Sequence, residues 1–223
     1  MTPTNNETIN ISEIFYSLQG EGTRAGMPCV FVRLQGCMFR CSWCDTKYAQ
    51  DANQIVKLMT DREILDKIAS YNCNFIAFTG GEPLLQENIY SLLTECCNRG
   101  YIVVLETSGH LSLSQVDARV TKIMDFKCPS SEMSHLNNYE NIQYLNQQDE
   151  IKFVIANRMD YEWTKEIISK YSLINKTKTI LFSTVFDLLK PSELAAWILE
   201  DKLNVVLQLQ LHKYIWEPNK RGV

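Results

Sequence analysis

Short runs of β-branched and aromatic residues alternate along the chain with stretches in which apolar residues recur at helical spacing. The apolar runs predict strands over residues 29–35, 74–79, 101–106, 120–127, 150–156, 178–183 and 205–211. The amphipathic stretches predict helices over residues 60–71, 85–99 and 192–203. Thr60 and Glu63 have the spacing of a capping box, Gly100 is a helix stop, and Pro191 suits a first helical turn.

Strands that alternate with helices imply right-handed crossovers and a parallel sheet. Seven strands are too few for a closed eight-stranded barrel, which takes about 250 residues. We therefore expect an α/β fold, an incomplete (open) β/α barrel with about six or seven mostly parallel strands, ahead of a doubly wound open sheet. No repeat or linker is visible, so residues 1–223 are expected to form a single domain that starts with a polar, mobile segment at residues 1–7.

Polar clusters follow the ends of the predicted strands, over residues 79–83, 106–109, 125–127 and 208–213, and a cysteine-rich loop follows the first strand. In parallel α/β folds the functional site lies at the edge where the carboxyl ends of the strands meet. The pattern therefore predicts one shared site at that edge.

Composition limits the classes of function. The chain is 45% hydrophobic and 22% charged, and its net charge of −4 gives no electrostatic case for a nucleic-acid partner. No apolar run approaches the roughly 20 residues that span a membrane, and no signal-sequence pattern is present. We expect a cytoplasmic protein with reduced thiols, in which five cysteines are buried and inert: Cys29, Cys73, Cys96, Cys97 and Cys128.

The other three cysteines, Cys37, Cys41 and Cys44, lie close together in the chain. Thiolates are the usual ligands of iron–sulfur clusters, and three of them leave one iron of a four-iron cluster open to a small molecule. Their spacing would also place them on one face of a helix as small core residues. Gly36 before them and Asp45 after them favour a loop that binds a cluster.

A Gly-Gly turn after a strand is usually only a turn, although Gly80 and Gly81 would let a ligand approach the backbone and Glu82 could hold a cationic amino group. Taken together, however, the cysteine triplet after the first strand and the Gly-Gly-Glu-Pro segment after the second resemble the radical S-adenosylmethionine superfamily. The resemblance implies a 4Fe–4S cluster on the three cysteines, which are the catalytic residues. It also implies bound S-adenosylmethionine, cleaved to a 5′-deoxyadenosyl radical that takes a hydrogen atom from the substrate. The residues implied to bind S-adenosylmethionine are Trp43, Cys44, Asp45, Gly80, Gly81, Glu82, Thr107, Ser108, Asp125, Lys127, Lys152 and Ser183.

Further segments, residues 14–22, 44–46 and 210–214 together with Arg33, are similar to the 7-carboxy-7-deazaguanine synthase family and follow its order over nearly the whole chain. That resemblance implies a lyase that converts 6-carboxy-5,6,7,8-tetrahydropterin to 7-carboxy-7-deazaguanine and ammonia, on the route to queuosine and other deazapurines. It implies Mg²⁺ on Thr46, with substrate bound by Leu18, Gln19, Gly20, Glu21, Arg33, Thr79, His212 and Lys213.

These residue types suit a pterin. Gln19 both donates and accepts, Glu21 accepts from ring N–H groups, and Arg33 offers a planar fork to a carboxylate. Each also has an ordinary structural interpretation: Glu21 as a solvated acid, Arg33 paired with a neighbouring acid, Thr46 as a turn cap, and His212 as a core histidine in the last strand.

The resemblance also implies a homodimer and an electron donor such as flavodoxin or ferredoxin. Some relatives end shortly after the His-Lys-Tyr sequence, whereas here residues 215–223 follow, so no terminal contact is assigned to Val223. Two alternatives stay open. One is an activase that places a glycyl radical on a partner protein, and the other is an interaction module with a structural Zn²⁺, although Zn²⁺ normally has four protein ligands and no fourth has obvious spacing.

Overall fold

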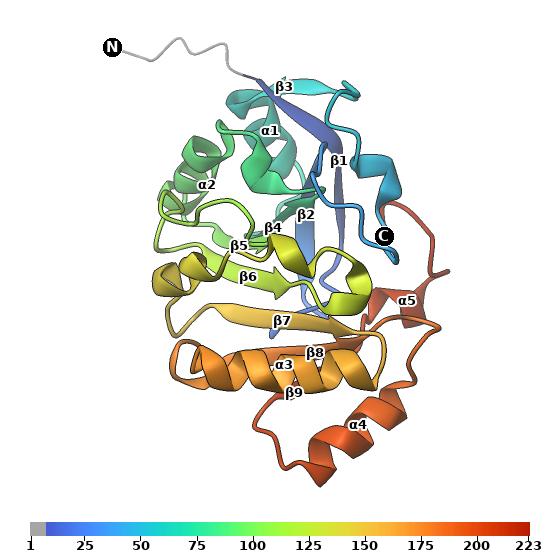
Figure 1. Ribbon diagram of the computed structural model, residues 1–223. Helices are drawn as coiled ribbons and strands as arrows, with labels where there is room; N and C mark the ends of the chain where they lie inside the picture. Colours follow the sequence, from blue (N-terminus) through green and yellow to red (C-terminus); the bar gives the residue numbers. More distant parts are fainter. Residues whose placement is uncertain (1–7) are drawn as a thin grey trace.

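Nine strands form one sheet in the computed structural model, which describes residues 8–223. Their order across the sheet is β3-β1-β2-β4-β5-β6-β7-β8-β9 (Figure 1). The strands β2 and β4 to β9 run parallel, and β1 is antiparallel to both of its neighbours. Their bounds are β1 (Thr8–Leu18), β2 (Pro28–Leu34), β3 (Leu58–Thr60), β4 (Phe75–Gly80), β5 (Ile102–Thr107), β6 (Thr121–Phe126), β7 (Glu150–Ile155), β8 (Thr179–Thr184) and β9 (Val206–Gln208).

The helices lie around the outside of the strands (Figure 1). The α-helices are α1 (Asp61–Ala69), α2 (Ile89–Asn98), α3 (Arg158–Lys170), α4 (Pro191–Glu200) and α5 (His212–Ile215). Short 3₁₀-helices lie in the loops: η1 (Lys47–Ala49), η2 (Pro83–Leu85), η3 (Pro129–Ser131), η4 (Ser134–Leu136), η5 (Tyr139–Tyr144) and η6 (Leu173–Asn175). Within residues 8–223 no helix is both long and apolar enough to cross a bilayer.

The prediction of an open, mostly parallel α/β fold is confirmed, and the seven predicted strands correspond to β2 and β4 to β9. The strands β1 and β3 were not predicted. The last strand prediction is wrong after Gln208, because the chain turns away there and the Leu211 N–H donates to the Gly20 carbonyl. The predicted mobile segment at residues 1–7 lies outside the described residues.

The predicted capping box at α1 is confirmed. The Glu63 N–H donates to the Thr60 hydroxyl at 3.3 Å, and the Glu63 carboxylate accepts from the Thr60 N–H at 2.8 Å. The second helix begins at Ile89 and not at residue 85, because Pro83 starts a separate 3₁₀ turn. The helix α4 begins at Pro191, which takes the first-turn position expected of it.

Successive side chains along each strand point to opposite faces of the sheet, and each face packs into its own hydrophobic core. In β2, Val30, Val32 and Leu34 face the main core under the helices, whereas Cys29 and Phe31 face the inside of the curved sheet. The inner core is small and lies toward the amino ends of the strands: Cys29, Phe31, Phe75, Ala77, Val104, Ile123 and Leu181. The next inward positions along these strands are polar. The inside of the open barrel is therefore packed at one end and free for a site at the other.

Candidate active site

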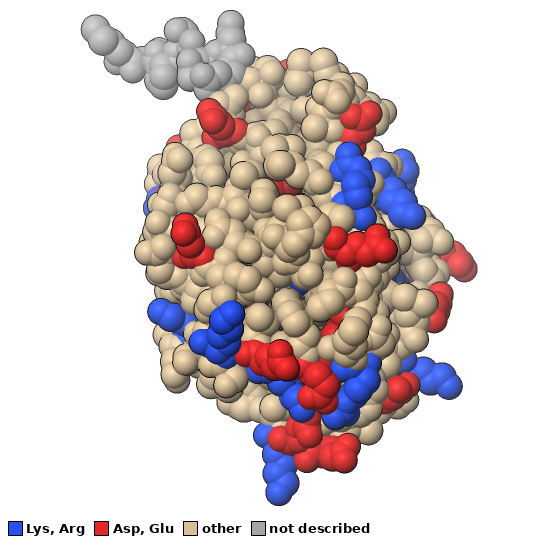
Figure 2. All heavy atoms as spheres, viewed as in Figure 1, with Lys and Arg blue, Asp and Glu red and all other residues tan. Residues whose placement is uncertain are grey.

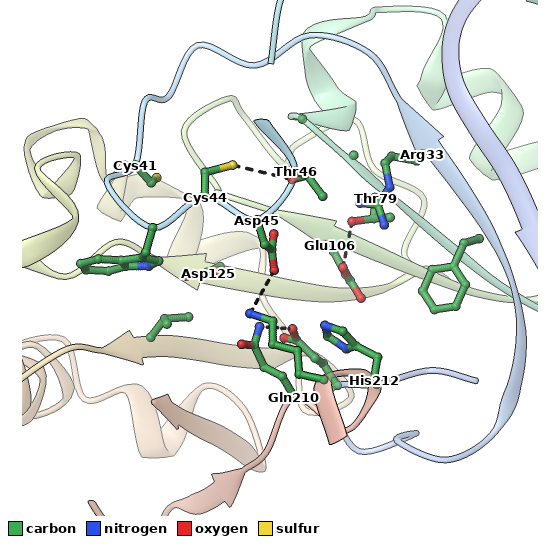
Figure 3. Close-up of a pocket in the computed structure, with 18 of the residues that line it drawn as sticks. Arg33, Cys41, Cys44, Asp45, Thr46, Thr79, Glu106, Asp125, Gln210 and His212 are labelled. Atoms are coloured by element: carbon green, nitrogen blue, oxygen red, sulfur yellow. Dashed lines mark hydrogen bonds and ion pairs between the residues drawn. The ribbon is translucent and has the colours of Figure 1, made fainter. Parts of the chain in front are cut away.

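A cavity of about 320 Å³ opens at the carboxyl ends of the parallel strands, where the sequence predicts the site. Figure 3 shows side chains from the strand ends, the cysteine loop and the last turn of the chain gathered around it. Two of the predicted site residues, Glu82 and Ser183, do not line the cavity. Those that line it are Leu18, Gln19, Gly20, Glu21, Arg33, Cys37, Cys41, Trp43, Cys44, Asp45, Thr46, Thr79, Gly80, Gly81, Thr107, Ser108, Asp125, Lys127, Lys152, His212 and Lys213.

The three cysteines of the triplet lie on an irregular loop between β2 and η1 and not on a helix, as predicted. The loop is tied at its base, where the Gly36 N–H donates to the Ala49 carbonyl at 2.8 Å. Gly36 has φ +102°, a conformation that favours glycine. The chain therefore turns sharply out of β2 and brings all three thiols to one side of the cavity.

The loop fits a cluster. All three thiols are free and line one cavity, and the Phe39 N–H donates to the sulfur of Cys37 at 3.4 Å, the kind of bond that tunes a cluster. Burial raises the pKa of Cys41 to about 11, so a metal that binds this sulfur must displace the thiol proton. Over residues 8–223 no three His, Cys, Asp or Glu side chains gather at a single point, whereas in a cluster each thiolate binds a different iron, so the thiols need not converge on one point. Met38, which lies between Cys37 and Cys41 in the chain, is 54% exposed and does not line the cavity.

Gly80 and Gly81 allow β4 and the cysteine loop to pack backbone against backbone. A Cβ on Gly81 would overlap the carbonyl oxygen of Gly36, and one on Gly80 would overlap the backbone of Leu34. The Glu82 N–H donates to that same Gly36 carbonyl at 2.8 Å. The glycine pair therefore fixes where the cysteine loop stands relative to the end of β4.

The Glu82 carboxylate is buried behind the cavity wall and its oxygens are already in use. It accepts from the Thr107 hydroxyl at 2.7 Å, from the Ser108 N–H at 2.8 Å and from the Ser108 hydroxyl at 2.6 Å. Glu82 thus orients Thr107 and Ser108, which do line the cavity, and is not itself placed to hold a ligand's amino group.

Opposite charges alternate across the floor of the cavity. Lys127 lies 3.0 Å from Asp125, and Lys152 lies 3.9 Å from Asp125 and is also paired with Glu21. Burial lowers the pKa of Lys127 and of Lys152, but the neighbouring carboxylates outweigh it and the net pKa of each is raised. Both lysines are therefore cations at neutral pH.

Glu21 is held by Lys152 and by two glutamines of the polar cluster at residues 208–213, which the sequence did not single out as individual site residues. Its carboxylate accepts from the Gln210 amide at 2.8 Å and the Gln208 amide at 3.2 Å, besides its pairing with Lys152. Burial alone would raise the pKa of Glu21, yet Lys152 and Gln210 lower it to about 2. Ser183 lies beneath this group, fully buried, and accepts from the same Gln208 amide at 3.1 Å.

A second carboxylate, Glu106, also faces the cavity at the end of β5. It accepts from the Thr79 hydroxyl at 2.9 Å and from the Gln19 amide at 3.1 Å. Burial, followed by the charge of Glu21, raises the pKa of Glu106. Its place in a polar cluster at a predicted strand end was the signal that could have identified it.

Arg33 lines the cavity but is already paired, as its ordinary interpretation held. Its Nε lies 2.8 Å from Glu13, and the Tyr48 hydroxyl donates to the same carboxylate oxygen at 2.7 Å. Glu13 lies on β1, which the sequence did not predict, so this partner of Arg33 could not be found from the sequence.

The last part of the site comes from the chain after β9. His212 begins α5 and does not lie in a strand as expected; a Cβ on Gly20 would overlap its ring, so glycine is required there. Burial lowers the pKa of His212, opposed by the charge of Glu21. Lys213 lies 3.5 Å from Asp45, and the Thr46 hydroxyl lies 3.7 Å from the sulfur of Cys44.

Comparison with known proteins gives a consistent result. Residues 31–199 match the model of the radical SAM superfamily. A 7-carboxy-7-deazaguanine synthase of Chlorobaculum tepidum is 45% identical over 96% of this chain and 97% of its own, and one of Koribacter versatilis is 40% identical over 96% and 100%. The crystal structure of QueE from Escherichia coli superposes with a TM-score of 0.77 at 24% identity, covering 92% of this chain and 95% of that one, and shows the same fold. The chain is a radical S-adenosylmethionine enzyme and belongs to the 7-carboxy-7-deazaguanine synthase family.

Proposed function

We propose that this enzyme is a carbon–nitrogen lyase that converts 6-carboxy-5,6,7,8-tetrahydropterin to 7-carboxy-7-deazaguanine with loss of ammonia, in queuosine or deazapurine biosynthesis. One observation carries the proposal: two partly buried carboxylates of opposite electrostatic character, Glu21 and Glu106, face the same cavity as the cysteine loop. Gln19 bonds to Glu106 between them and adds both a donor and an acceptor. This is a suitable wall for the amide and amine edges of a pterin.

The cofactors would occupy the opposite wall. Cys37, Cys41 and Cys44 would hold a 4Fe–4S cluster, and Gly80 and Gly81, which line the cavity beside them, would bind the methionine end of S-adenosylmethionine. The cluster and S-adenosylmethionine supply, when bound, a 5′-deoxyadenosyl radical that takes hydrogen from the substrate. The other wall residues proposed to contact S-adenosylmethionine are Trp43, Asp45, Thr107, Ser108, Asp125, Lys127 and Lys152.

The substrate would bind between that wall and the end of β1. Glu21 stays ionised and accepts from ring N–H groups, while His212 and Lys213 add donors at the far side. The Thr46 hydroxyl is a hard oxygen that suits Mg²⁺, which takes few protein ligands and shares its remaining sites with substrate. Such an ion would hold the substrate carboxylate and orient the reacting carbon.

We place the reaction in the cytoplasm, where thiols stay reduced, with a flavodoxin or ferredoxin as electron donor and a homodimer as the working form. No nucleic acid takes part in this step. The net charge is −4, and Figure 2 shows basic and acidic side chains intermixed on the face in view, not a basic surface.

The test is an anaerobic turnover assay of cluster-reconstituted protein with S-adenosylmethionine, Mg²⁺, reductant and 6-carboxy-5,6,7,8-tetrahydropterin. We expect 7-carboxy-7-deazaguanine by mass spectrometry, and its loss in Cys41→Ala, because two thiolates cannot hold the cluster with an open iron. Cys97→Ala, a partly exposed thiol outside the cavity, is the matched control and should keep the activity. Formation of 5′-deoxyadenosine without the deazaguanine would reject the substrate and keep the radical chemistry.

A further inference from the structure

Residues 218–223 close one side of the cavity, although every predicted site residue precedes them. After α5 the chain runs back toward the cysteine loop, and the C-terminus lies close to η1 in Figure 1. There the guanidinium carbon of Arg221 lies 3.6 Å from the centre of the Tyr48 ring. A cation over an aromatic face is an attractive contact, so Arg221 fixes the end of this segment against η1.

Arg221 differs from most other cationic side chains around the cavity because it has no carboxylate partner. The cavity-lining lysines and arginine from the rest of the fold are all paired with carboxylates, namely Arg33 with Glu13, Lys127 with Asp125, Lys152 with Glu21 and Lys213 with Asp45. Among residues 8–223, only Lys220 and Arg221 line the cavity as lysine or arginine without a carboxylate oxygen within 4.0 Å. The final segment therefore brings two cationic side chains without a carboxylate partner to the cavity.

Tyr48 connects Arg221 to Arg33. The Tyr48 hydroxyl and the Nε of Arg33 share one oxygen of Glu13, at 2.7 Å and 2.8 Å. The terminal nitrogens of Arg33 make no hydrogen bond to any described residue. Two guanidinium groups therefore border the same corner of the cavity, one paired with Glu13 through its Nε and the other without a carboxylate partner among residues 8–223.

We propose that Arg221 is a specificity-determining residue which, together with Arg33, binds the carboxylate of the substrate at this corner. The inference rests on the proposed function, because it takes a carboxylated pterin as the substrate. The planar donors of a guanidinium match a carboxylate, and a second cation compensates for the charge that Glu13 removes from Arg33. A pterin without the carboxylate leaves these donors unpaired, so it binds less well.

The experiment compares two fluorescent ligands, 6-carboxypterin and unsubstituted pterin, titrated into the reconstituted holoenzyme with Mg²⁺ and S-adenosylmethionine under anaerobic conditions. In Arg221→Gln we expect affinity for 6-carboxypterin to fall about tenfold and affinity for unsubstituted pterin to stay unchanged. Arg221→Lys keeps the charge and should recover part of the loss. Arg62→Gln, an exposed arginine on α1, is the matched control and should change neither affinity.

Turnover gives a second readout: Arg221→Gln should raise KM and leave kcat nearly unchanged, because the contact exists before and during the reaction. An equal loss of affinity for both ligands would overturn the proposal and make the segment a general cover. Unchanged affinity for both would overturn it as well. If the unaltered enzyme prefers 6-carboxypterin while Arg221→Gln retains that preference, only this inference fails. If the unaltered enzyme shows no preference and forms no deazaguanine, the proposed function fails with it.

Discussion

At the scale of single residues, the cavity places two carboxylates in opposite electrostatic states. Lys152 and Gln210 overcome the effect of burial at Glu21 and lower its pKa, whereas burial and the charge of Glu21 raise the pKa of Glu106. Pairs of titratable groups pushed apart in this way mark different roles in acid–base chemistry. Glu21 is therefore a permanent acceptor, and Glu106 is the better candidate to hold a proton near the substrate.

Replacing Glu21 with Gln should lower the free energy of unfolding at pH 7 by about 3 kcal/mol, because its pKa falls from 4.5 to about 2 on folding. A carboxyl whose pKa is lowered by folding stabilises the protein above its unfolded pKa and loses that effect as the pH falls through its folded pKa. The difference between Glu21→Gln and the unaltered protein should therefore shrink from pH 4.5 toward pH 2. Urea unfolding followed by circular dichroism at several pH values measures it.

Glu106→Gln is the matched variant, since it changes the other partly buried carboxylate of the same cavity. The pKa of Glu106 is raised by folding, so its ionisation costs stability once the pH exceeds the unfolded pKa. The glutamine removes that cost and keeps an oxygen for Thr79, so Glu106→Gln should be at least as stable as the unaltered protein at pH 8. Equal destabilisation by the two variants would contradict the opposite environments assigned to these residues.

At the scale of elements, the junction between β4 and the cysteine loop sets the geometry of the cluster wall. Gly81 has no room for a Cβ because the backbones of Gly36 and Ala49 lie against it. Both contacts are backbone atoms, which cannot move aside as a flexible side chain can. The strand end and the loop that carries the thiols therefore act as one unit.

Gly81→Ala should force this unit apart and lower the bound iron and sulfide several-fold, while α1 and the far strands stay folded. The measurement is iron and sulfide per chain after reconstitution, together with the absorbance near ~400 nm that marks the cluster. Gly100→Ala is the control, because φ +83° makes alanine strained there but no atom lies within 4 Å of the new Cβ. It should lose about 1 kcal/mol of stability and keep its cluster. A full complement of iron in Gly81→Ala would contradict this prediction, because it would show that β4 and the cysteine loop can move apart to make room for the Cβ without loss of the cluster.

The sequence predicts best those strands that are buried on both faces. The strand β4 is covered on both sides, so it contains a continuous apolar run, residues 75–78, that the sequence shows directly. In contrast, β1 is half-buried, with an irregular register between Ile11 and Glu13, and mixes polar with apolar positions. Its pairing with β2 depends on contacts across the 19–27 loop, which no local pattern encodes. Glu13, the partner of Arg33, was missed for the same reason.

At the scale of the whole molecule, the 19–27 loop spans the open side of the barrel. The strands β1 and β9 are not neighbours in the sheet, yet the Gly22 N–H donates to the Gln208 amide oxygen and the Leu211 N–H to the Gly20 carbonyl. Buried Glu150 accepts from Thr23 on the same loop. The residue types at these positions could be predicted from motifs, but their contacts join residues nearly the whole chain apart and needed the fold.

Gln208→Ala should therefore loosen the loop that carries Glu21 without unfolding the barrel. The Gln208 amide is buried and bonds to Gly22, Glu21 and Ser183, so its removal costs about 2 kcal/mol locally. We expect faster amide hydrogen exchange in residues 19–27 by mass spectrometry, with little change in the peptides that cover α1.

The matched control is Gln143→Ala, an exposed glutamine whose amide bonds only to a backbone carbonyl of its own turn, and it should leave exchange in residues 19–27 unchanged. If the proposed substrate site is right, KM rises in Gln208→Ala in step with the exchange rate, because a mobile Glu21 must be ordered again when the pterin binds. Faster exchange with an unchanged KM would separate the loop from substrate binding. Unchanged exchange would mean that the other contacts of the loop, such as those of Thr23 with Glu150, hold it across the open side of the barrel without Gln208.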